Sequence, residues 1–207
     1  MTRSSVTETG VTEESGGYCF GYGSLANAET HSFEIIGMMS LRGWRRSWAH
    51  WVTSSDRKAT SLTIVPSGTS DVLGALLRVP ASGWAGLAER ENGYDLSFLD
   101  PSLIEEHPSR FSTTETCQTY ISRQENRGGD DHPIFLSYID TVAQGFLRVG
   151  GEDAAGTFFN TTDGWSTPVL NDRAAPRYPR ATVLSHSEQS LVDDALAGLA
   201  VRWSETL

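Results

Sequence analysis

Two glycines and a serine follow an apolar run in the segment 20–25, whose sequence is FGYGSL. Glycine has no side chain, so a ligand can approach the backbone closely at Gly21 and Gly23. The amides after these glycines, together with the Ser24 hydroxyl, can donate to a carboxylate or to an oxyanion that develops during a reaction. The segment therefore predicts a cradle for a small anionic group, and a plain tight turn is the alternative.

The residues 21–26 also fit G-x-G-x-x-A, a loose form of the dinucleotide fingerprint. In a Rossmann domain this motif leads through a helix to a parallel strand, and an acidic residue about 20 positions later binds the ribose. The corresponding region here, 41–46, is basic, which would suit the 2′-phosphate of NADP. The strands that follow are expected to form a hairpin without helices between them. An NADP-dependent oxidoreductase is therefore kept only as a less favoured alternative.

A carboxylate lies on the apolar side of a helix that the sequence predicts over 81–91. The residues with helical spacing on that side are Trp84, Leu87, Ala88 and Glu91. Glu89 and Arg90 are expected to point elsewhere. Burial and the negative end of the helix dipole both raise the pKa of a carboxylate in the last turn, which suits it to proton transfer. Glu91 is therefore predicted as a general acid–base, with a structural Glu paired to an arginine as the alternative.

The clearest helical pattern covers 133–149, and Tyr138 lies on its apolar face. The ring of Tyr138 is expected in the core, with its hydroxyl at a wet edge. The five histidines are scattered, and none has the spacing or the acidic neighbours of a metal ligand. No serine lies in a G-x-S-x-G setting. The sequence thus predicts neither a metal site nor a nucleophile elbow.

These side chains need a sheet and helices to position them, and the sequence predicts both. Strands are expected over 18–22, 41–54, 116–124, and in two runs of 61–79 on either side of a turn at 66–71. In the strand 41–54, one face carries Trp44, Arg46, Trp48, His50 and Val52. A third helix is expected over 187–203. Successive strands with short turns predict an α+β fold in which a mainly antiparallel small barrel or sheet is flanked by helices.

The segment 160–181 is long, irregular and rich in Pro, Asp and Arg. Such segments are uncommon in compact domains unless they form a lid or a binding loop, so this one is predicted near the mouth of the site. Its charged residues could pair with one another or meet a substrate carboxylate; they are Asp172, Arg173, Arg177 and Arg180. A packed connector is the alternative. The polar residues 1–17 are predicted as a disordered tail, and 18–207 as one domain.

The chain has 207 residues, a formal charge of −10 and a pI near 4.9. This acidity argues against sequence-independent nucleic-acid binding and against docking on anionic membranes, which both need lysine and arginine. No apolar stretch approaches the roughly 18 residues of a membrane helix, and 1–17 lack the apolar core of a signal peptide. Cys19 and Cys117 are expected to be buried. The sequence predicts a soluble, cytoplasmic protein with a small-molecule partner, no nucleic acid and no membrane.

Four of these segments together resemble the γ-glutamylcyclotransferase-like superfamily, which includes the glutathione-degrading ChaC proteins and the AIG2-like proteins. FGYGSL at 20–25 looks like its strand-and-loop signature, and ERENGYDL at 89–96 resembles its acidic motif, with the family's catalytic Glu at Glu91. LRGWRRSW at 41–48 is similar to a basic-aromatic strand. Tyr138 and Gly145 match a weaker motif in which Tyr precedes Gly by seven positions. The resemblance covers about residues 18–150.

The resemblance implies a γ-glutamylcyclotransferase-like fold and a cofactor-independent enzyme. Its substrate would be a γ-glutamyl amide (glutathione, a γ-glutamyl amino acid or a γ-glutamyl amine), from which 5-oxoproline is released with Glu91 as acid–base. The residues that would bind this substrate are Tyr22, Gly23, Ser24, Leu25 and Tyr138. A non-catalytic γ-glutamyl-binding or regulatory module on the same fold is the alternative. The sequence does not identify the leaving amine.

Overall fold

The computed structural model describes residues 16–54, 58–105, 111–112, 114–123 and 131–204, and every structural statement below concerns this part of the chain. The predicted N-terminal tail therefore lies outside the described residues, apart from its last two positions. The first strand begins at Gly17, one residue earlier than the sequence indicates.

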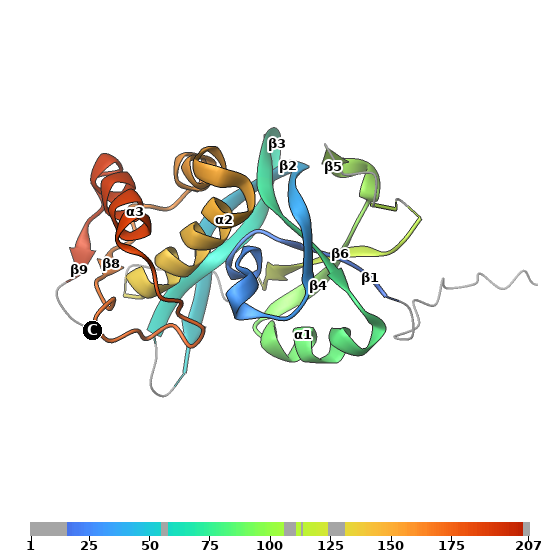
Figure 1. The fold of residues 1–207 in the computed structure, drawn as a ribbon, viewed down its shortest axis with the longest axis horizontal. Coiled ribbons are helices and arrows are strands. Elements are labelled where there is room, and N and C mark those ends of the chain that lie inside the picture. Colours follow the sequence, from blue (N-terminus) through green and yellow to red (C-terminus); the bar gives the residue numbers. More distant parts are fainter. Residues whose placement is uncertain (1–15, 55–57, 106–110, 113, 124–130, 205–207) are drawn as a thin grey trace, which may run out of the picture.

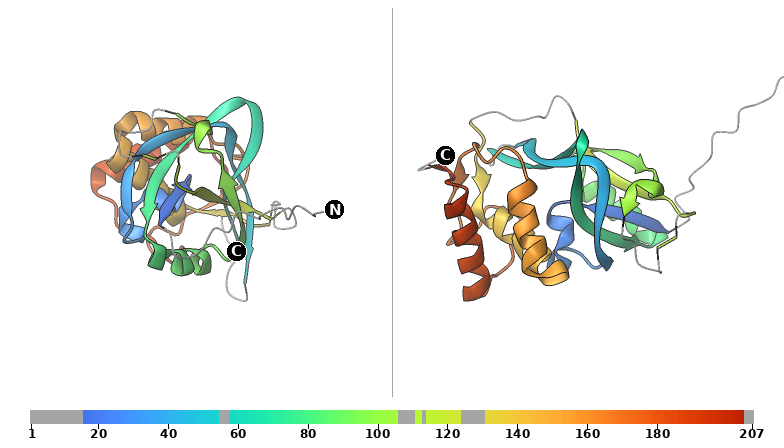
Figure 2. Two further views of the ribbon diagram at one scale, coloured as in Figure 1. Left: turned by 90° about the vertical axis from the view of Figure 1, so that its right-hand side faces the viewer. Right: turned by 90° about the horizontal axis from the view of Figure 1, so that it is seen from above.

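A six-stranded mixed sheet curls into a half-barrel (Figures 1 and 2). Its strand order is β4-β6-β1-β3-β2-β5. Only the pairing of β1 with β6 is parallel, and the other neighbours are antiparallel. The strands are β1 (Gly17–Gly21), β2 (Glu34–Thr53), β3 (Lys58–Val79), β4 (Tyr94–Leu99), β5 (Ile104–Glu105) and β6 (Cys117–Ser122). The predicted α+β class and the mainly antiparallel sheet are confirmed.

The prediction of a turn at 66–71 is wrong, because β3 covers these residues as part of one strand. Trp44 of β2 pairs with Pro66, and Arg42 pairs with Asp71, so the residues between Pro66 and Asp71 form a bulge opposite Gly43. Proline and glycine are typical of turns, but they are also tolerated at bulges. The long β2–β3 pair continues on both sides of the irregularity and holds it within the sheet.

The helices agree with the sequence in place but differ in extent. They are α1 (Trp84–Arg90), α2 (Leu136–Thr161) and α3 (His186–Gly198). A 3-10 turn, η3 (Ala81–Gly83), precedes α1. The sequence predicted that the second helix ends near 149, but α2 bends at Gly151, where φ is 75°, and then continues. None of these helices is long and apolar enough to cross a membrane.

Short elements complete the described fold and were not predicted, because two or three residues leave no periodicity to detect. Three parallel two-residue strands form a second sheet: β7 (Ile134–Phe135), β8 (Val169–Leu170) and β9 (Trp203–Ser204). Thus α3 ends before the predicted limit of 203. Three further 3-10 turns are η1 (Ser24–Ala26), η2 (Ala28–Thr30) and η4 (Pro101–Leu103).

Helix α2 lies between the half-barrel and α3 in the views of Figures 1 and 2, and it contacts both. Its Phe146 and Phe158 are fully buried. The ring of Phe158 meets Trp48 of β2 edge to face, at a centroid distance of 6.4 Å. This packing fixes α2, and with it Tyr138, against the sheet that carries residues 21–25, named the glycine loop below.

Gly145 lets α2 approach the backbone of η1. A Cβ at this position would lie 2.7 Å from the carbonyl carbon of Ala26 and 2.7 Å from the amide nitrogen of Asn27. We expect Gly145→Ala to lower the free energy of unfolding by about 1–3 kcal/mol, the usual cost of overpacking. Urea denaturation measures this loss. Gly156→Ala in the same helix, where a Cβ meets nothing within 4 Å, is the control and should be neutral or stabilising.

Candidate active site

Two neighbouring cavities lie where β1 ends and α1 ends. The larger one, named the outer cavity here, has a volume of about 170 Å³, and the smaller one, named the inner cavity, about 30 Å³. Ser24, Glu91, Tyr94 and Tyr138 line both of them. The six residues that the sequence singled out all line the inner cavity: Tyr22, Gly23, Ser24, Leu25, Glu91 and Tyr138. The fold therefore brings together motifs that are separated by more than 100 positions in the chain.

Glu91 caps the C-terminal end of α1. Its amide donates to the Leu87 carbonyl at 3.0 Å, and its carbonyl accepts from the Tyr94 amide at 2.9 Å. Only 16% of its side chain is exposed. Burial raises the pKa of this carboxyl above its ordinary value, while Arg90 and Arg180 partly oppose the rise. A carboxylate whose pKa is raised takes up a proton more readily than an exposed Glu, which suits it to proton transfer.

The side chain of Arg90 points into the site, contrary to the prediction. Its Nε lies 3.0 Å from Oε1 of Glu91, Nη1 donates to the Thr30 carbonyl at 2.8 Å, and Nη2 donates to Ser24 Oγ at 3.0 Å. Helical spacing does not govern this contact, because α1 ends at Arg90 and the chain turns at Glu91. Ala88, assigned by spacing to the apolar side, is exposed. Arg90 thus links the carboxylate to the glycine loop.

The glycine loop presents three free amides. The next two amides are used within the loop, because Ala26 donates to the Gly23 carbonyl at 2.9 Å and Asn27 donates to the Ser24 carbonyl at 3.1 Å. Among the described residues, the amides of Gly23, Ser24 and Leu25 have no acceptor. Buried backbone donors are usually paired, so three unpaired amides beside a cavity suit an anionic ligand.

The Ser24 hydroxyl is held from two sides. It accepts from Arg90 Nη2, and the Tyr178 hydroxyl donates to it at 2.8 Å. The ring of Tyr178 in turn contacts that of Tyr138, with centroids 4.7 Å apart. These contacts leave the Ser24 side chain little freedom, which fixes the loop that it belongs to.

Four tyrosines line the inner cavity, namely Tyr22, Tyr94, Tyr120 and Tyr138. The Tyr22 hydroxyl donates to the Tyr120 carbonyl at 2.5 Å, and the Tyr94 hydroxyl donates to the Leu62 carbonyl at 2.9 Å. Burial raises the pKa of Tyr22, Tyr94 and Tyr138 well above that of a free phenol. These three phenols are therefore neutral at ordinary pH, and Tyr138 lies at the cavity wall as its amphipathic character predicts.

The space beside Gly23 decides between a cradle and a plain turn. A Cβ there would lie 3.0 Å from the Tyr138 hydroxyl. If the protein binds 5-oxoproline, as the sequence resemblance implies, Gly23→Val should weaken that binding at least about tenfold in calorimetry, because overpacking of about 1.4 kcal/mol corresponds to that factor. Gly68→Val, where a Cβ meets nothing within 4 Å, is the control. Unchanged affinity in a folded Gly23→Val protein would favour the plain turn.

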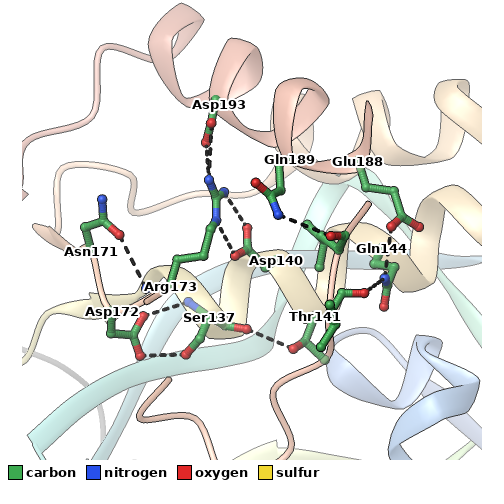
Figure 3. Close-up of polar contacts among 12 residues, drawn as sticks. Ser137, Asp140, Thr141, Gln144, Asn171, Asp172, Arg173, Glu188, Gln189 and Asp193 are labelled. Atoms are coloured by element: carbon green, nitrogen blue, oxygen red, sulfur yellow. Dashed lines mark hydrogen bonds and ion pairs between the residues drawn. The ribbon is translucent and has the colours of Figure 1, made fainter. Parts of the chain in front are cut away.

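The segment 160–181 is packed against α2 as a connector, and its end reaches the outer cavity through Tyr178, Pro179 and Arg180. Figure 3 shows how it is held. The Asp172 carboxylate accepts from the Ser137 amide at 2.8 Å and from Ser137 Oγ at 2.6 Å. The sequence left open whether the charged residues pair with one another or meet a substrate carboxylate; Asp172 instead binds Ser137 and accepts from the Arg177 backbone amide at 2.8 Å.

Arg173 anchors the same segment to two helices (Figure 3). Its guanidinium donates to both carboxylate oxygens of Asp140 at 2.8 Å and lies 2.9 Å from Asp193 of α3. Arg177 is exposed, and its guanidinium lies over the Phe135 ring. Arg180 is exposed at the cavity wall and makes no hydrogen bond or ion pair with any described residue. Of the arginines in this segment, it is the one that lines the outer cavity and can meet a ligand there.

No protein-family model matches the chain, and no curated protein matches it in sequence. Solved structures do match. A structure described as a γ-glutamyl cyclotransferase is 16% identical, with a TM-score of 0.57 over 86% of this chain and 99% of its own. An uncharacterized protein from Homo sapiens is 16% identical, with a TM-score of 0.56 over 87% and 99%. YkqA from Bacillus subtilis is 19% identical, with a TM-score of 0.52 over 72% and 56%.

The chain has the γ-glutamylcyclotransferase-like fold. The expectation that followed from the sequence motifs is confirmed at this level, and identities below 20% transfer no residue roles. In this fold the G-x-G-x-x-A match does not open a β-α-β unit, because β1 leads through η1 and η2 to β2, which pairs antiparallel with β3. The NADP alternative therefore lacks the architecture that it needs. In the described ranges, no three His, Cys, Asp or Glu side chains gather as a metal site would require.

Proposed function

We propose that this protein is a γ-glutamylcyclotransferase, which releases 5-oxoproline from a γ-glutamyl amide. The observation that carries the proposal is the position of the Glu91 carboxylate, which lines the same inner cavity as the glycine loop with its free amides at Gly23, Ser24 and Leu25. The fold supports the class of enzyme. A small-molecule partner and a cytoplasmic location belong to the same proposal.

The proposed reaction uses a nucleophile that the substrate itself carries. The α-amine attacks the γ-carbonyl carbon, a new C–N bond closes the five-membered ring, and the amide C–N bond to the leaving amine breaks. Intramolecular attack already provides the proximity that a bimolecular reaction lacks. The Glu91 carboxylate takes the proton from the attacking amine and then gives it to the leaving nitrogen. The protein ends each cycle in its starting protonation state, and these steps require no cofactor.

The groups around Glu91 stabilise the oxyanion, position the carboxylate and attract the substrate. The free amides of the loop donate to the oxyanion of the tetrahedral intermediate or to the substrate α-carboxylate. Arg90 holds one oxygen of Glu91 and leaves the other for the proton transfer. Arg180, at the wall of the outer cavity, adds positive charge that attracts an anionic substrate.

The test is a direct product assay. Purified protein is incubated with glutathione, several γ-glutamyl amino acids and several γ-glutamyl amines, and 5-oxoproline is measured. Release from at least one substrate class supports the proposal and identifies the leaving amine. If no compound yields 5-oxoproline but one binds in calorimetry, the protein is a γ-glutamyl-binding module, and the catalytic proposal is wrong.

The rate should depend on pH through Glu91. Because burial raises the pKa of its carboxyl and the base form is the reactive one, kcat/KM should rise with pH through a pKa above the usual value of about 4.3 for Glu. Initial rates of 5-oxoproline release between pH 4 and 9 measure this limb. A limb that follows the pKa of an unperturbed Glu would contradict the assigned role.

A further inference from the structure

The guanidinium of Arg46 is buried directly behind the glycine loop. Arg46 lies on β2 and is 0% exposed. Its charge lies over two aromatic rings of α2, at 4.7 Å from the centroid of Phe146 and 5.3 Å from that of Phe158. Among the described residues, no carboxylate lies within ion-pair distance of it. A cation is costly to bury in this way unless polar groups satisfy it, so its partners require an explanation.

These partners are carbonyl groups and one hydroxyl. Nε donates to the Tyr22 carbonyl at 2.7 Å, Nη2 donates to the Leu73 carbonyl, and Nη1 lies 3.4 Å from Thr162 Oγ1. Burial lowers the pKa of Arg46 to about 9, so the side chain is still charged at neutral pH. The Tyr22 carbonyl therefore accepts a hydrogen bond from a cation, whose charge is shared with the contacts to Leu73 and Thr162.

The Tyr22 carbonyl and the Gly23 amide belong to one peptide group. No cis peptide bond occurs in the described chain, and in a trans peptide the oxygen and the amide hydrogen point in opposite directions. Arg46 holds the oxygen side. The amide on the other side belongs to Gly23, which lines the inner cavity and whose N–H has no acceptor among the described residues.

We propose that Arg46 is a positioning residue that orients and polarises the Tyr22–Gly23 peptide, so that the Gly23 amide donates more strongly to the oxyanion. The proposal rests on the proposed cyclotransferase function. A cation bound to the carbonyl oxygen withdraws electron density from the peptide nitrogen, and linked hydrogen bonds strengthen one another in this way. The fixed orientation also means that the donor does not reorganise when negative charge develops.

Arg46→Met and Arg46→Lys test the proposal, with the same substitutions at Arg45 as matched controls. Arg45 is the next residue on β2, pairs with Asp163, and has 41% of its side chain exposed. We expect Arg46→Met to lower kcat about 10- to 100-fold, somewhat less than the loss of a whole oxyanion donor, with KM within about twofold of wild type. Arg46→Lys should recover part of kcat, and the Arg45 variants should match wild type.

A second readout does not depend on turnover. In ¹⁵N-labelled protein, the nitrogen shift of the Gly23 amide responds to hydrogen bonding at the Tyr22 carbonyl and should move in both Arg46 variants but in neither Arg45 variant. If wild type releases no 5-oxoproline, the proposed function fails, and this shift still tests the polarisation alone. If Arg46→Met does not fold, Arg46→Lys decides both readouts. A folded Arg46 variant with wild-type kcat and an unmoved Gly23 shift would overturn the proposal.

Discussion

Replacing Glu91 by Gln should lower kcat for 5-oxoproline release by about 10²–10⁴-fold, the usual contribution of a positioned acid–base group. The amide has nearly the size of the carboxylate and can still accept from Arg90, but it cannot take up the proton of the attacking amine. KM should change little, because Glu91 acts in the proton-transfer step and not in the binding of the substrate. Steady-state kinetics on the best substrate of the panel measure the effect.

A measurement of thermal stability distinguishes a loss of catalysis in Glu91→Gln from a loss of folding. The pKa of Glu91 is raised in the folded protein, so its ionisation lowers stability as pH rises from the unfolded pKa towards the folded one. Glu91→Gln removes this loss, and its melting temperature at neutral pH should be equal to or above that of wild type. Glu89→Gln, at an exposed position of α1, is the control and should keep both rate and stability. A Glu91→Gln protein that turns over like wild type would make Glu91 structural.

Arg90→Met should have the second largest effect. It removes the side chain that binds Glu91, Ser24 and Thr30, so the carboxylate and the loop both lose a partner. Arg90 lowers the pKa of Glu91 by its charge and by its hydrogen bond. Without it this pKa rises further, and the pH–rate limb should move to higher pH. At neutral pH we expect kcat/KM to fall about 10²-fold, roughly 2.7 kcal/mol of transition-state stabilisation.

Arg180→Met is a second variant in which the same shift of the pH–rate profile is expected to be smaller than in Arg90→Met. Arg180 also lowers the pKa of Glu91, but by its charge alone, and it is exposed. Its removal should shift the same limb in the same direction by a smaller amount. If Arg90→Met moved the limb to lower pH, or left it in place, Arg90 would not control the ionisation of Glu91.

Spacing along the sequence located the carboxylate but not its environment. Helical periodicity correctly placed Leu87 on the buried side of α1 and directed attention to Glu91. It failed for Arg90, because the helix ends there and the direction of the next side chains depends on the turn. It also failed for Ala88, since a seven-residue helix at the surface buries only a narrow stripe.

Contacts between segments that are distant in the chain could not be predicted from the sequence either. Alternation along β2 placed Arg46 with Trp48 and His50, and all three are buried. No pattern in the sequence indicates that the Arg46 guanidinium binds the Tyr22 carbonyl, or that Tyr178 reaches Ser24 across more than 150 positions. These contacts depend on how α2 packs on the sheet, which local propensity does not determine.

The most direct test of the central claim is the fate of oxygen during turnover. The γ-glutamyl compound with the highest rate is converted in water enriched in ¹⁸O, and the products are analysed by mass spectrometry. Cyclisation by the substrate's own amine predicts 5-oxoproline and free amine in equal amounts, with no ¹⁸O in either. Glutamate carrying ¹⁸O in its γ-carboxylate would instead show attack by water, and would contradict the proposed reaction.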